Sequence, residues 1–275
     1  MTHTRGIADF HPQHSEPLVM GILNVTPDSF SDGGRYVSVE AALLRARAML
    51  EEGADIIDVG GESTRPGADS VTVDEELARV IPVIEALRRA TEAPVSVDTS
   101  KPEVMRAAAA AGASMINDVR ALQADGAPEL LAELGLPVCL MHMQGEPRSM
   151  QAKPHYDDVV REVLDFLLKR AQVCMRAGVA AERIVLDPGF GFGKTLEHNL
   201  ALLAGLDRIV EAGYPVLAGL SRKSMIGALL GDPECDRLVG SVALALYAVR
   251  KGAYIVRVHD VRQTRQALRV QSALA

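Results

Sequence analysis

The sequence predicts an α/β protein with a single (β/α)8 domain, the TIM barrel. Short apolar or β-branched runs alternate along the chain with longer stretches that are rich in Ala, Leu, Glu and Arg and have helical periodicity. Eight such pairs fit within 275 residues, as this barrel requires. Apolar residues make up 48% of the chain, which is ample for one sizeable core. We find no linker, so we expect residues 17–275 to form the domain and the polar residues 1–16 to be a mobile N-terminal segment.

The expected strands are the apolar runs at residues 18–24, 55–61, 94–99, 114–119, 137–143, 184–189, 215–221 and 254–260. The expected helices lie between and after them, at residues 39–52, 73–90, 102–111, 127–134, 157–176, 197–212, 237–251 and 261–273. Several strands follow a Gly and a small residue, which is a typical way to end a helix. A doubly wound open sheet is the structural alternative. The count of eight, and the lack of a GxGxxG motif after the first strand, favour the barrel.

The composition excludes several classes of protein. A net charge of −7 argues against a general nucleic-acid binder, because phosphate binding needs a basic surface. Residues 1–16 contain no signal-peptide core, and no apolar run approaches the length that spans a membrane. Cys139, Cys174 and Cys235 are too far apart for a disulfide framework or a metal pair, and they fit free thiols in a reducing cytosol. We expect a soluble cytoplasmic protein without nucleic-acid or membrane partners.

Nearly every expected strand ends in polar or charged residues, although buried parallel strands are normally apolar. These residues are Asn24, Asp58, Glu62, Thr64, Arg65, Asp98, Asn117, Asp118, His142, Asp187, Ser221, Arg222, Lys223, Arg257 and His259. In TIM barrels the C-terminal rim of the strands is the active-site face. Any one of these residues could be a helix N-cap or a solvated loop residue. Their coincidence on eight strands indicates an enzyme with a polar pocket of mixed charge.

Asp98, Asn117 and Asp187 offer two carboxylates and an amide for ligand recognition. A carboxylate matches the adjacent N–H donors of an aminopyrimidinone edge in a bidentate way. An amide can both donate and accept, and Lys223 could donate to a ring carbonyl. These four residues therefore indicate a heterocycle that presents N–H donors.

The remaining cations of the rim suggest an anion on the opposite side of the pocket. Arg65, Arg257 and His259, together with Thr64, would make an anion-binding arc. The planar guanidinium of Arg257 could also stack on a flat ring. The arc therefore indicates a phosphate or diphosphate group on the ligand.

Eight motifs stand in order between residues 20 and 260. They are MGILNVTPDSFSDGG at 20–34, DVGGESTRPG at 58–67, VDTSK at 97–101, INDV at 116–119, MHMQG at 141–145, LDPGFGFGK at 186–194, GLSRKSMIG at 219–227 and RVHD at 257–260. In sequence and order they resemble the signatures of the dihydropteroate synthases, a family of pterin-binding TIM-barrel enzymes. We see no departure at a position that this family uses.

The resemblance implies a role for each matching residue. Those expected to bind the pterin are Asp98, Asn117, Val119, Met141, Asp187, Phe192, Gly219, Lys223 and Arg257. Those expected to bind the diphosphate are Asn24, Thr64, Arg65, Arg257 and His259, with Mg²⁺ beside Asn24. Those expected to bind p-aminobenzoate are Phe30, Pro66, Lys223 and Ser224. Those expected to act in catalysis are Asp32, Arg65, Lys223, Arg257 and His259.

The resemblance also implies a reaction. The family displaces diphosphate from the exocyclic methylene of a pterin, and the amine of p-aminobenzoate forms the new C–N bond. Ionisation is expected to precede amine attack, with electrostatic stabilisation of the leaving diphosphate by the arc and Mg²⁺. The segments 25–37 and 63–70 are expected to close over the diphosphate. Family members are commonly homodimers, so the helix at 238–249 is either an interface or an ordinary barrel-facing helix.

Three other functions remain as alternatives. A methyltetrahydrofolate-dependent methyltransferase shares the Asp/Asn/Asp pterin site, but needs neither the arc nor the TPDSFSDGG segment. A non-catalytic pterin-binding paralogue would typically lose loop or anion-binding residues, and none is missing here. A nucleotide-binding domain is opposed by residues 189–195, where Pro188 replaces the first glycine of a phosphate-binding loop. We expect the glycines of this segment to let the backbone turn tightly beside the bound ring.

Single residues also have two interpretations. Asp32 is either a stabiliser of the cationic pterin or a turn residue before two glycines. His142 is either a metal ligand or, as we favour, a hydrogen-bonded structural histidine, because no second His or Cys stands at ligand spacing. Glu62 could act as a general base or pair with a neighbouring arginine.

Overall fold

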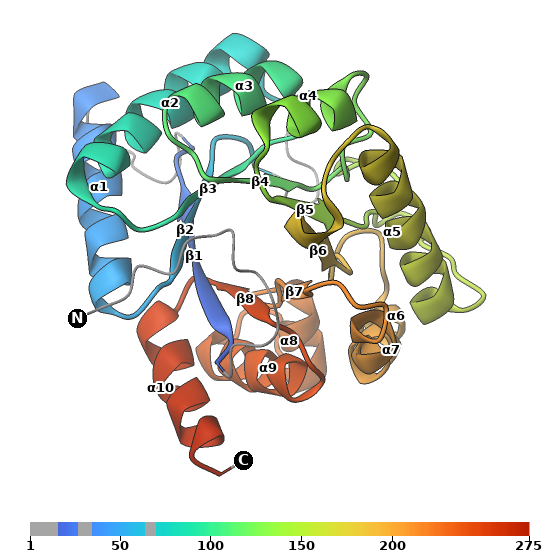
Figure 1. Cartoon of the computed structure of the whole chain (residues 1–275). Helices are drawn as coiled ribbons and strands as arrows, with labels where there is room; N and C mark the ends of the chain where they lie inside the picture. The colour runs from blue at the N-terminus through green and yellow to red at the C-terminus, as the bar shows by residue number, and fades with distance from the viewer. Residues whose placement is uncertain (1–15, 27–34, 64–69, 275) are drawn as a thin grey trace.

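The computed structural model describes residues 16–26, 35–63 and 70–274, and in it eight parallel strands form one sheet around a central axis (Figure 1). The strands are β1 (Leu18–Asn24), β2 (Ile56–Gly60), β3 (Val95–Asp98), β4 (Met115–Asp118), β5 (Val138–Met141), β6 (Ile184–Asp187), β7 (Leu217–Ala218) and β8 (Ile255–Val258). Their order is β6-β5-β4-β3-β2-β1-β8-β7. An isolated parallel bridge between Leu186 and Val216 joins β6 to the start of β7 and closes the circle. The predicted (β/α)8 barrel is confirmed.

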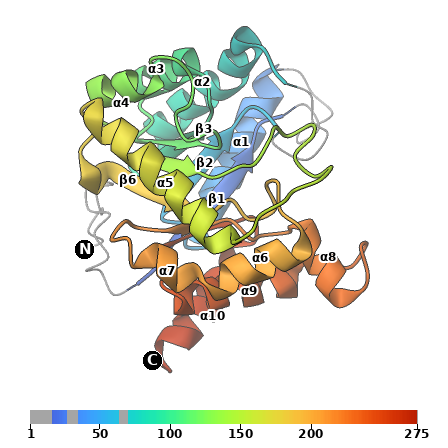
Figure 2. The same ribbon diagram turned by 90° about the vertical axis from the view of Figure 1, so that its right-hand side faces the viewer.

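Helices follow the strands and cover the outside of the barrel (Figures 1 and 2). They are α1 (Arg35–Glu51), α2 (Val73–Ala90), α3 (Pro102–Ala110), α4 (Ala127–Leu134), α5 (Val159–Arg176), α6 (Leu196–Ala204), α7 (Leu206–Val210), α8 (Ser224–Leu230), α9 (Leu238–Arg250) and α10 (Val261–Ser272). No helix in the described parts of the chain is long and apolar enough to cross a membrane. The expected mobile segment 1–16 lies outside the described residues, apart from Glu16.

Apart from shifts of a few residues at the ends of elements, three elements differ from the prediction. The helix expected at 197–212 is two helices, α6 and α7, which meet at Gly205. A Cβ at Gly205 would lie 2.9 Å from Cγ2 of Val160 in α5, so the close packing of α5 requires glycine there. Helix α8 was not expected, because seven residues are too few to establish a period. Strand β7 has two residues in place of the seven expected.

The inside of the barrel has an apolar floor and a polar rim. The floor is a cluster made of Leu18, Met20, Ile56, Met115, Cys139, Val185, Leu217, Tyr254 and Ile255. Successive side chains of a strand point to opposite faces, so residues an even number of positions beyond the floor also face inward. The residues that this rule places on the inner face are Asn24, Asp58, Val119, Asn117, Met141, Asp187, Gly219, Arg257 and His259. The parallel register pairs Asp98 of β3 with Gly60 and Asn117, so Asp98 belongs to the same layer.

Candidate active site

Arg257 of β8 lies at the centre of the polar rim and binds two carboxylates. Its Nε donates to Asp58 Oδ2 at 2.6 Å, and its Nη2 donates to Asp98 Oδ2 at 2.8 Å. The amide of Asn117 donates to the same Asp58 oxygen at 3.2 Å. Side chains from β2, β3, β4 and β8 therefore meet in one network. The prediction assigned no role to Asp58, although an acidic residue with the same parity as buried Ile56 was a sign that it faces inward.

Burial controls the charge of these groups. It raises the pKa of Asp98 to about 7, although the neighbouring Arg257 guanidinium acts in the opposite direction. Burial likewise raises the pKa of Asp187, although the hydrogen bond from the Gly189 backbone N–H and the charge of Lys223 both act to lower it. Burial alone would lower the pKa of Arg257, but Asp58 and Asp98 raise it overall. The rim thus holds a permanent cation beside Asp98, whose carboxyl group can change protonation near neutral pH.

Asp187 ends β6 opposite Met141 of β5, and the turn after it is shaped by glycine. Its Oδ1 accepts from the N–H of Gly189 at 2.7 Å, which fixes the carboxylate. Gly189 has a φ of 68°, and a Cβ there would lie 1.9 Å from the carbonyl oxygen of His142. The expected tight turn is therefore present, and only glycine fits it.

We expect Gly189→Ala to destabilise the protein by more than about 3 kcal/mol, because the new Cβ collides with the His142 backbone and the left-handed φ is strained. Gly126→Ala is the matched control. Its φ of 72° is nearly the same, but no atom lies within 4 Å of the added Cβ. It should cost only about 1 kcal/mol. Thermal unfolding midpoints measure both effects, and equal midpoints would show that the close approach at Gly189 is unimportant.

His142 and Lys194 form a buried polar pair beneath the same turn. Lys194 Nζ lies 2.9 Å from His142 Nδ1 and donates to the carbonyl oxygens of Gly189 at 2.9 Å and Phe192 at 3.1 Å. Burial lowers the pKa of His142 to about 3 and that of Lys194 to about 7. Among the residues with described side chains, no group of three His, Cys, Asp or Glu could hold a metal ion. His142 is thus in hydrogen-bond contact with Lys194, and Lys194 braces the turn.

Lys223 follows β7 and reaches across to the β6 turn. Its Nζ donates to the carbonyl oxygen of Phe190 at 2.7 Å and lies 4.0 Å from the ring centroid of Phe192. Burial lowers the pKa of Lys223 to about 8, although Asp187 opposes that shift. Ser224, the first residue of α8, is exposed. The structure thus brings Lys223, Phe192 and Asp187 to one side of the rim.

His259 follows β8 and is fixed by Ser221. The Ser221 hydroxyl lies 3.0 Å from His259 Nδ1 and accepts from the His259 backbone N–H at 3.1 Å. The next residue, Arg222, has a left-handed φ of 58° and pairs with Asp260. The chains after β7 and β8 are therefore joined near Arg257, so two members of the expected arc, Arg257 and His259, lie at the same end of β8.

Asn24 at the end of β1 provides a possible magnesium ligand. It lies opposite Gly60, and a Cβ at Gly60 would be 3.7 Å from Asn24 Oδ1 and 3.9 Å from Asp98 Oδ2. Gly60 therefore leaves open a space lined by an amide and a carboxylate oxygen. Mg²⁺ prefers such hard oxygen ligands, and often needs only one or two from the protein when substrate phosphates supply others. The residues present fit a Mg²⁺ ion that is shared with a diphosphate.

Several predicted site residues have defined surroundings and others do not. Val119 and Met141 are buried, while Gly219 and Phe192 are partly exposed at the rim. The residues that lie outside the described part of the chain are Phe30, Asp32, Thr64, Arg65 and Pro66. Among the residues that the structure describes, Lys101 is the ion-pair partner of Glu62, at 2.5 Å, whereas the neighbouring Arg65 lies outside them.

Comparisons with known proteins agree with this geometry. A family model for pterin-binding enzymes matches residues 20–259. The dihydropteroate synthase of Haemophilus influenzae is 57% identical over 261 residues, which cover 95% of each chain. The solved structure of the Xanthomonas albilineans dihydropteroate synthase with 4-aminobenzoic acid has a TM-score of 0.89 and 57% identity, and covers 94% of this chain and 93% of that one.

A second structure from Xanthomonas albilineans, in complex with 7,8-dihydropteroate, has a TM-score of 0.85 and 54% identity and covers 94% of both chains. The family model and these relatives each extend over nearly the whole length of the chain. The protein therefore belongs to the pterin-binding enzymes and, within them, to the dihydropteroate synthases.

Proposed function

We propose that this chain condenses 6-hydroxymethyl-7,8-dihydropterin diphosphate with p-aminobenzoate to give 7,8-dihydropteroate and diphosphate, a transferase reaction of folate synthesis. The observation that carries the proposal is the inner polar layer, made of Asp58, Asp98, Asn117, Asp187 and Arg257, where the charge of Arg257 acts on both Asp98 and Asp187. The two Xanthomonas albilineans structures hold 4-aminobenzoic acid and 7,8-dihydropteroate, which are the second substrate and the product of this reaction.

The pterin binds with its N–H edge toward the inner carboxylates. The carboxylates of Asp98 and Asp187 accept from the N–H groups of the ring, the amide of Asn117 can both accept and donate, and Lys223 donates to the ring carbonyl group. The ammonium group of Lys223 already lies over the ring of Phe192. The side chain that packs against the pterin and the one that hydrogen-bonds to it therefore lie on the same side of the rim. Arg257, held by Asp58 and Asp98, presents its guanidinium plane to the ring and retains Nη1 for the diphosphate.

The chemical step breaks the bond between the pterin methylene carbon and the diphosphate oxygen, which keeps the electron pair. The nitrogen lone pair of p-aminobenzoate forms the new C–N bond, and the amine then loses a proton. Ionised Asp98 and Asp187 stabilise a cationic pterin, while Arg257 and His259 stabilise the departing anion together with Thr64 and Arg65. Asn24 would hold Mg²⁺, which would supply positive charge to neutralise the leaving diphosphate. This account requires no protein nucleophile.

Pterin affinity should depend on pH through Asp98. The pterin N–H donors bind the ionised carboxylate, and the pKa of Asp98 is raised to about 7. The dissociation constant should therefore be lowest above pH 8 and rise about tenfold by pH 6. Calorimetry with 6-hydroxymethyl-7,8-dihydropterin measures this effect, because that ligand lacks a titrating diphosphate. Asp98→Asn should bind more weakly with a flat profile between pH 6 and 8. The same slope in both proteins would contradict the assignment.

We propose that the enzyme works as a homodimer in the cytoplasm. Helix α9 buries Ser241, Ala245 and Ala248 toward the barrel, but leaves Val239 75% and Tyr247 44% exposed on another face. An apolar face of this kind supports self-association. Light scattering on the eluting protein should give twice the mass of one chain. A monomer at micromolar concentration would contradict the proposal.

Product formation tests the function. The purified protein is mixed with the pterin diphosphate and Mg²⁺, with and without p-aminobenzoate, and diphosphate and dihydropteroate are measured. Dihydropteroate that forms only when p-aminobenzoate is present, one per diphosphate released, is the expected result. Pterin binding without release of diphosphate would instead favour a methyltransferase-like or non-catalytic pterin-binding protein.

A further inference from the structure

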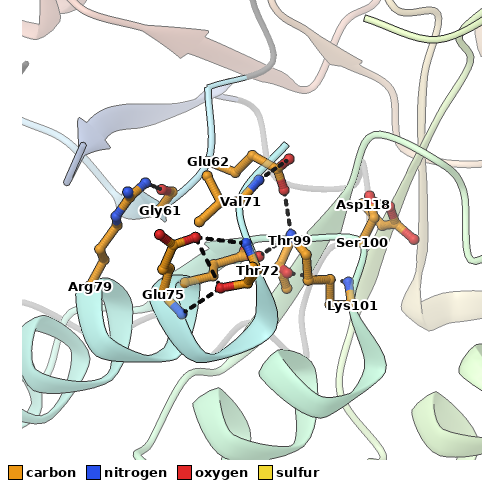
Figure 3. A network of polar contacts seen from close by, with 11 residues as sticks. Gly61, Glu62, Val71, Thr72, Glu75, Arg79, Thr99, Ser100, Lys101 and Asp118 are labelled. Atoms are coloured by element: carbon orange, nitrogen blue, oxygen red, sulfur yellow. Dashed lines mark hydrogen bonds and ion pairs between the residues drawn. The ribbon is translucent and has the colours of Figure 1, made fainter. Parts of the chain in front are cut away.

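A charged cluster of Glu62, Lys101 and Glu76, the Glu–Lys–Glu cluster, lies beside the inner polar layer; Glu62 and Lys101 are drawn in Figure 3. Lys101 Nζ donates to Glu62 Oε2 at 2.5 Å and to Glu76 Oε2 at 2.6 Å. Burial alone lowers the pKa of Lys101, but the hydrogen bonds to both carboxylates raise it overall. Lys101 is therefore charged at neutral pH, and it joins the end of β2 to helix α2.

Glu62 also ties together the two ends of the segment 64–69. Its Oε1 accepts from the backbone N–H of Val71 at 3.2 Å, while its Oε2 binds Lys101. Just before it, the carbonyl oxygen of Gly61 accepts from Arg79 of α2 at 2.8 Å (Figure 3). One side chain thus links the chain just before the segment 64–69 to the chain just after it. That segment carries Thr64 and Arg65, two members of the expected arc.

The approach of the chain to α2 at this point is close. A Cβ at Gly61 would lie 2.7 Å from Cγ1 of Val80 and 3.1 Å from Cγ of Glu76. The start of α2 is itself held by a capping box, in which the Thr72 hydroxyl accepts from the Glu75 N–H and the Glu75 carboxylate accepts from the Thr72 N–H (Figure 3). The start of α2, which follows Val71, is therefore fixed by its own hydrogen bonds.

On its other side, Lys101 belongs to the turn that follows Asp98 on β3. Ser100, its neighbour, donates to Asp118 at the end of β4 (Figure 3). Asp118 is fully buried and also accepts from the N–H groups of Arg120 at 2.8 Å and Leu122 at 2.7 Å. The turn at 99–101 thus connects β2, β3 and β4, the strands that carry Asp58, Asp98 and Asn117.

Stability is a poor explanation for the Glu–Lys–Glu cluster. Glu76 has no exposed surface, and its Oε1 is buried without a hydrogen-bond partner among the described residues. Desolvation of buried ion pairs often exceeds their attraction, and apolar replacements can be more stable. What such a cluster does supply is a defined position for the chain segments that it joins.

We propose that Glu62 and Lys101 are positioning residues for the reaction: they set the base of the segment that carries Thr64 and Arg65 relative to the pterin-binding strand β3. The inference rests on the proposed function, because the reaction needs the diphosphate and the pterin in one fixed arrangement. Neither residue contacts the reacting atoms. Their effect is on the alignment of the leaving group with the ring, for which small displacements are costly.

Glu62→Gln is the decisive variant, because it keeps the size of the side chain and an acceptor for Val71 but removes its charge. Lys101→Met is a harsher change, since it leaves buried Glu76 without a partner. Glu133→Gln is the matched control: Glu133 makes a bidentate pair with Arg106 at 2.7 and 3.0 Å, but both side chains are more than half exposed. The measurements are kcat, KM for both substrates, the affinity for diphosphate-free pterin, and the unfolding midpoint.

For Glu62→Gln we expect kcat/KM for the pterin diphosphate to fall about tenfold, while the affinity for diphosphate-free pterin stays within about twofold. Glu133→Gln should leave every constant within about twofold of the wild type. Unchanged kinetics in Glu62→Gln would overturn the proposal. So would a parallel loss of pterin affinity and of the unfolding midpoint, since that pattern indicates a merely structural role. An inactive wild-type chain would overturn both the function and this inference, whereas an active wild type with a fully active Glu62→Gln overturns the inference alone.

Discussion

Arg257→Ala should lower turnover by about a hundredfold, the largest kinetic effect of any single change in the rim. The guanidinium is expected to stabilise the departing diphosphate, and no other described side chain donates to both Asp58 and Asp98. Its removal also leaves the carboxylates of Asp58 and Asp98 to repel each other without a neighbouring positive charge. Because Asp58 is fully buried, we expect a loss of stability of about 3 kcal/mol as well. Steady-state kinetics and thermal unfolding measure the two effects separately.

Arg257→Lys distinguishes charge from geometry. A lysine keeps the positive charge but cannot donate from two fixed nitrogens to Asp58 and Asp98 at once. It should recover most of the stability but only part of the turnover. If Arg257→Ala keeps near-normal kinetics, the assignment of Arg257 to the diphosphate is wrong. If Arg257→Lys is as active as the wild type, the bidentate contact is not needed for the reaction.

Asp187→Asn should weaken pterin binding by at least about tenfold, which corresponds to about 1.4 kcal/mol. Oδ1 of Asp187 is engaged by the N–H of Gly189, so the second oxygen is available to a ligand. An amide in that place presents an N–H to the ring's own N–H donors, and the bidentate match is lost. Fold stability should change little, because asparagine retains an oxygen that can accept from Gly189.

Calorimetry with 6-hydroxymethyl-7,8-dihydropterin measures the Asp187→Asn effect directly. Glu133→Gln is a useful comparison, because it makes the same change from carboxylate to amide at an exposed pair with Arg106. Its pterin affinity should remain close to that of the wild type. Unchanged affinity in Asp187→Asn would exclude this carboxylate from the pterin site.

The sequence predicted the barrel and its polar rim, because both follow from the positions of the strands along the chain. Eight apolar runs at regular spacing specify the strands, and alternation along each strand decides which side chains point inward. Asp98, Asn117 and Asp187 were predicted as ligand-binding residues because they are polar and stand at the C-terminal ends of expected strands. Asp58 obeys the rule of alternation, but an acidic residue in the middle of an apolar run had no obvious partner until β8 placed Arg257 beside it.

Contacts between segments that are distant in the chain could not be predicted from the sequence patterns. Glu62 and Lys101 are 39 residues apart in the chain, and only the parallel pairing of β2 with β3 makes them neighbours. The break at Gly205 depends on the position of Val160 in α5, which local pattern cannot supply. Propensity and periodicity describe one element at a time, whereas ion pairs and close approaches require the positions of two.

A crystal structure of the protein with bound 7,8-dihydropteroate tests the central claim most directly, because it locates the pterin relative to the inner polar layer. We predict that the ring lies above the apolar floor of the barrel with its N–H edge within hydrogen-bond distance of Asp98, Asn117 and Asp187. The guanidinium of Arg257 should lie against the ring. A pterin bound outside the barrel rim, or turned so that its N–H edge faces away from these carboxylates, would contradict the account.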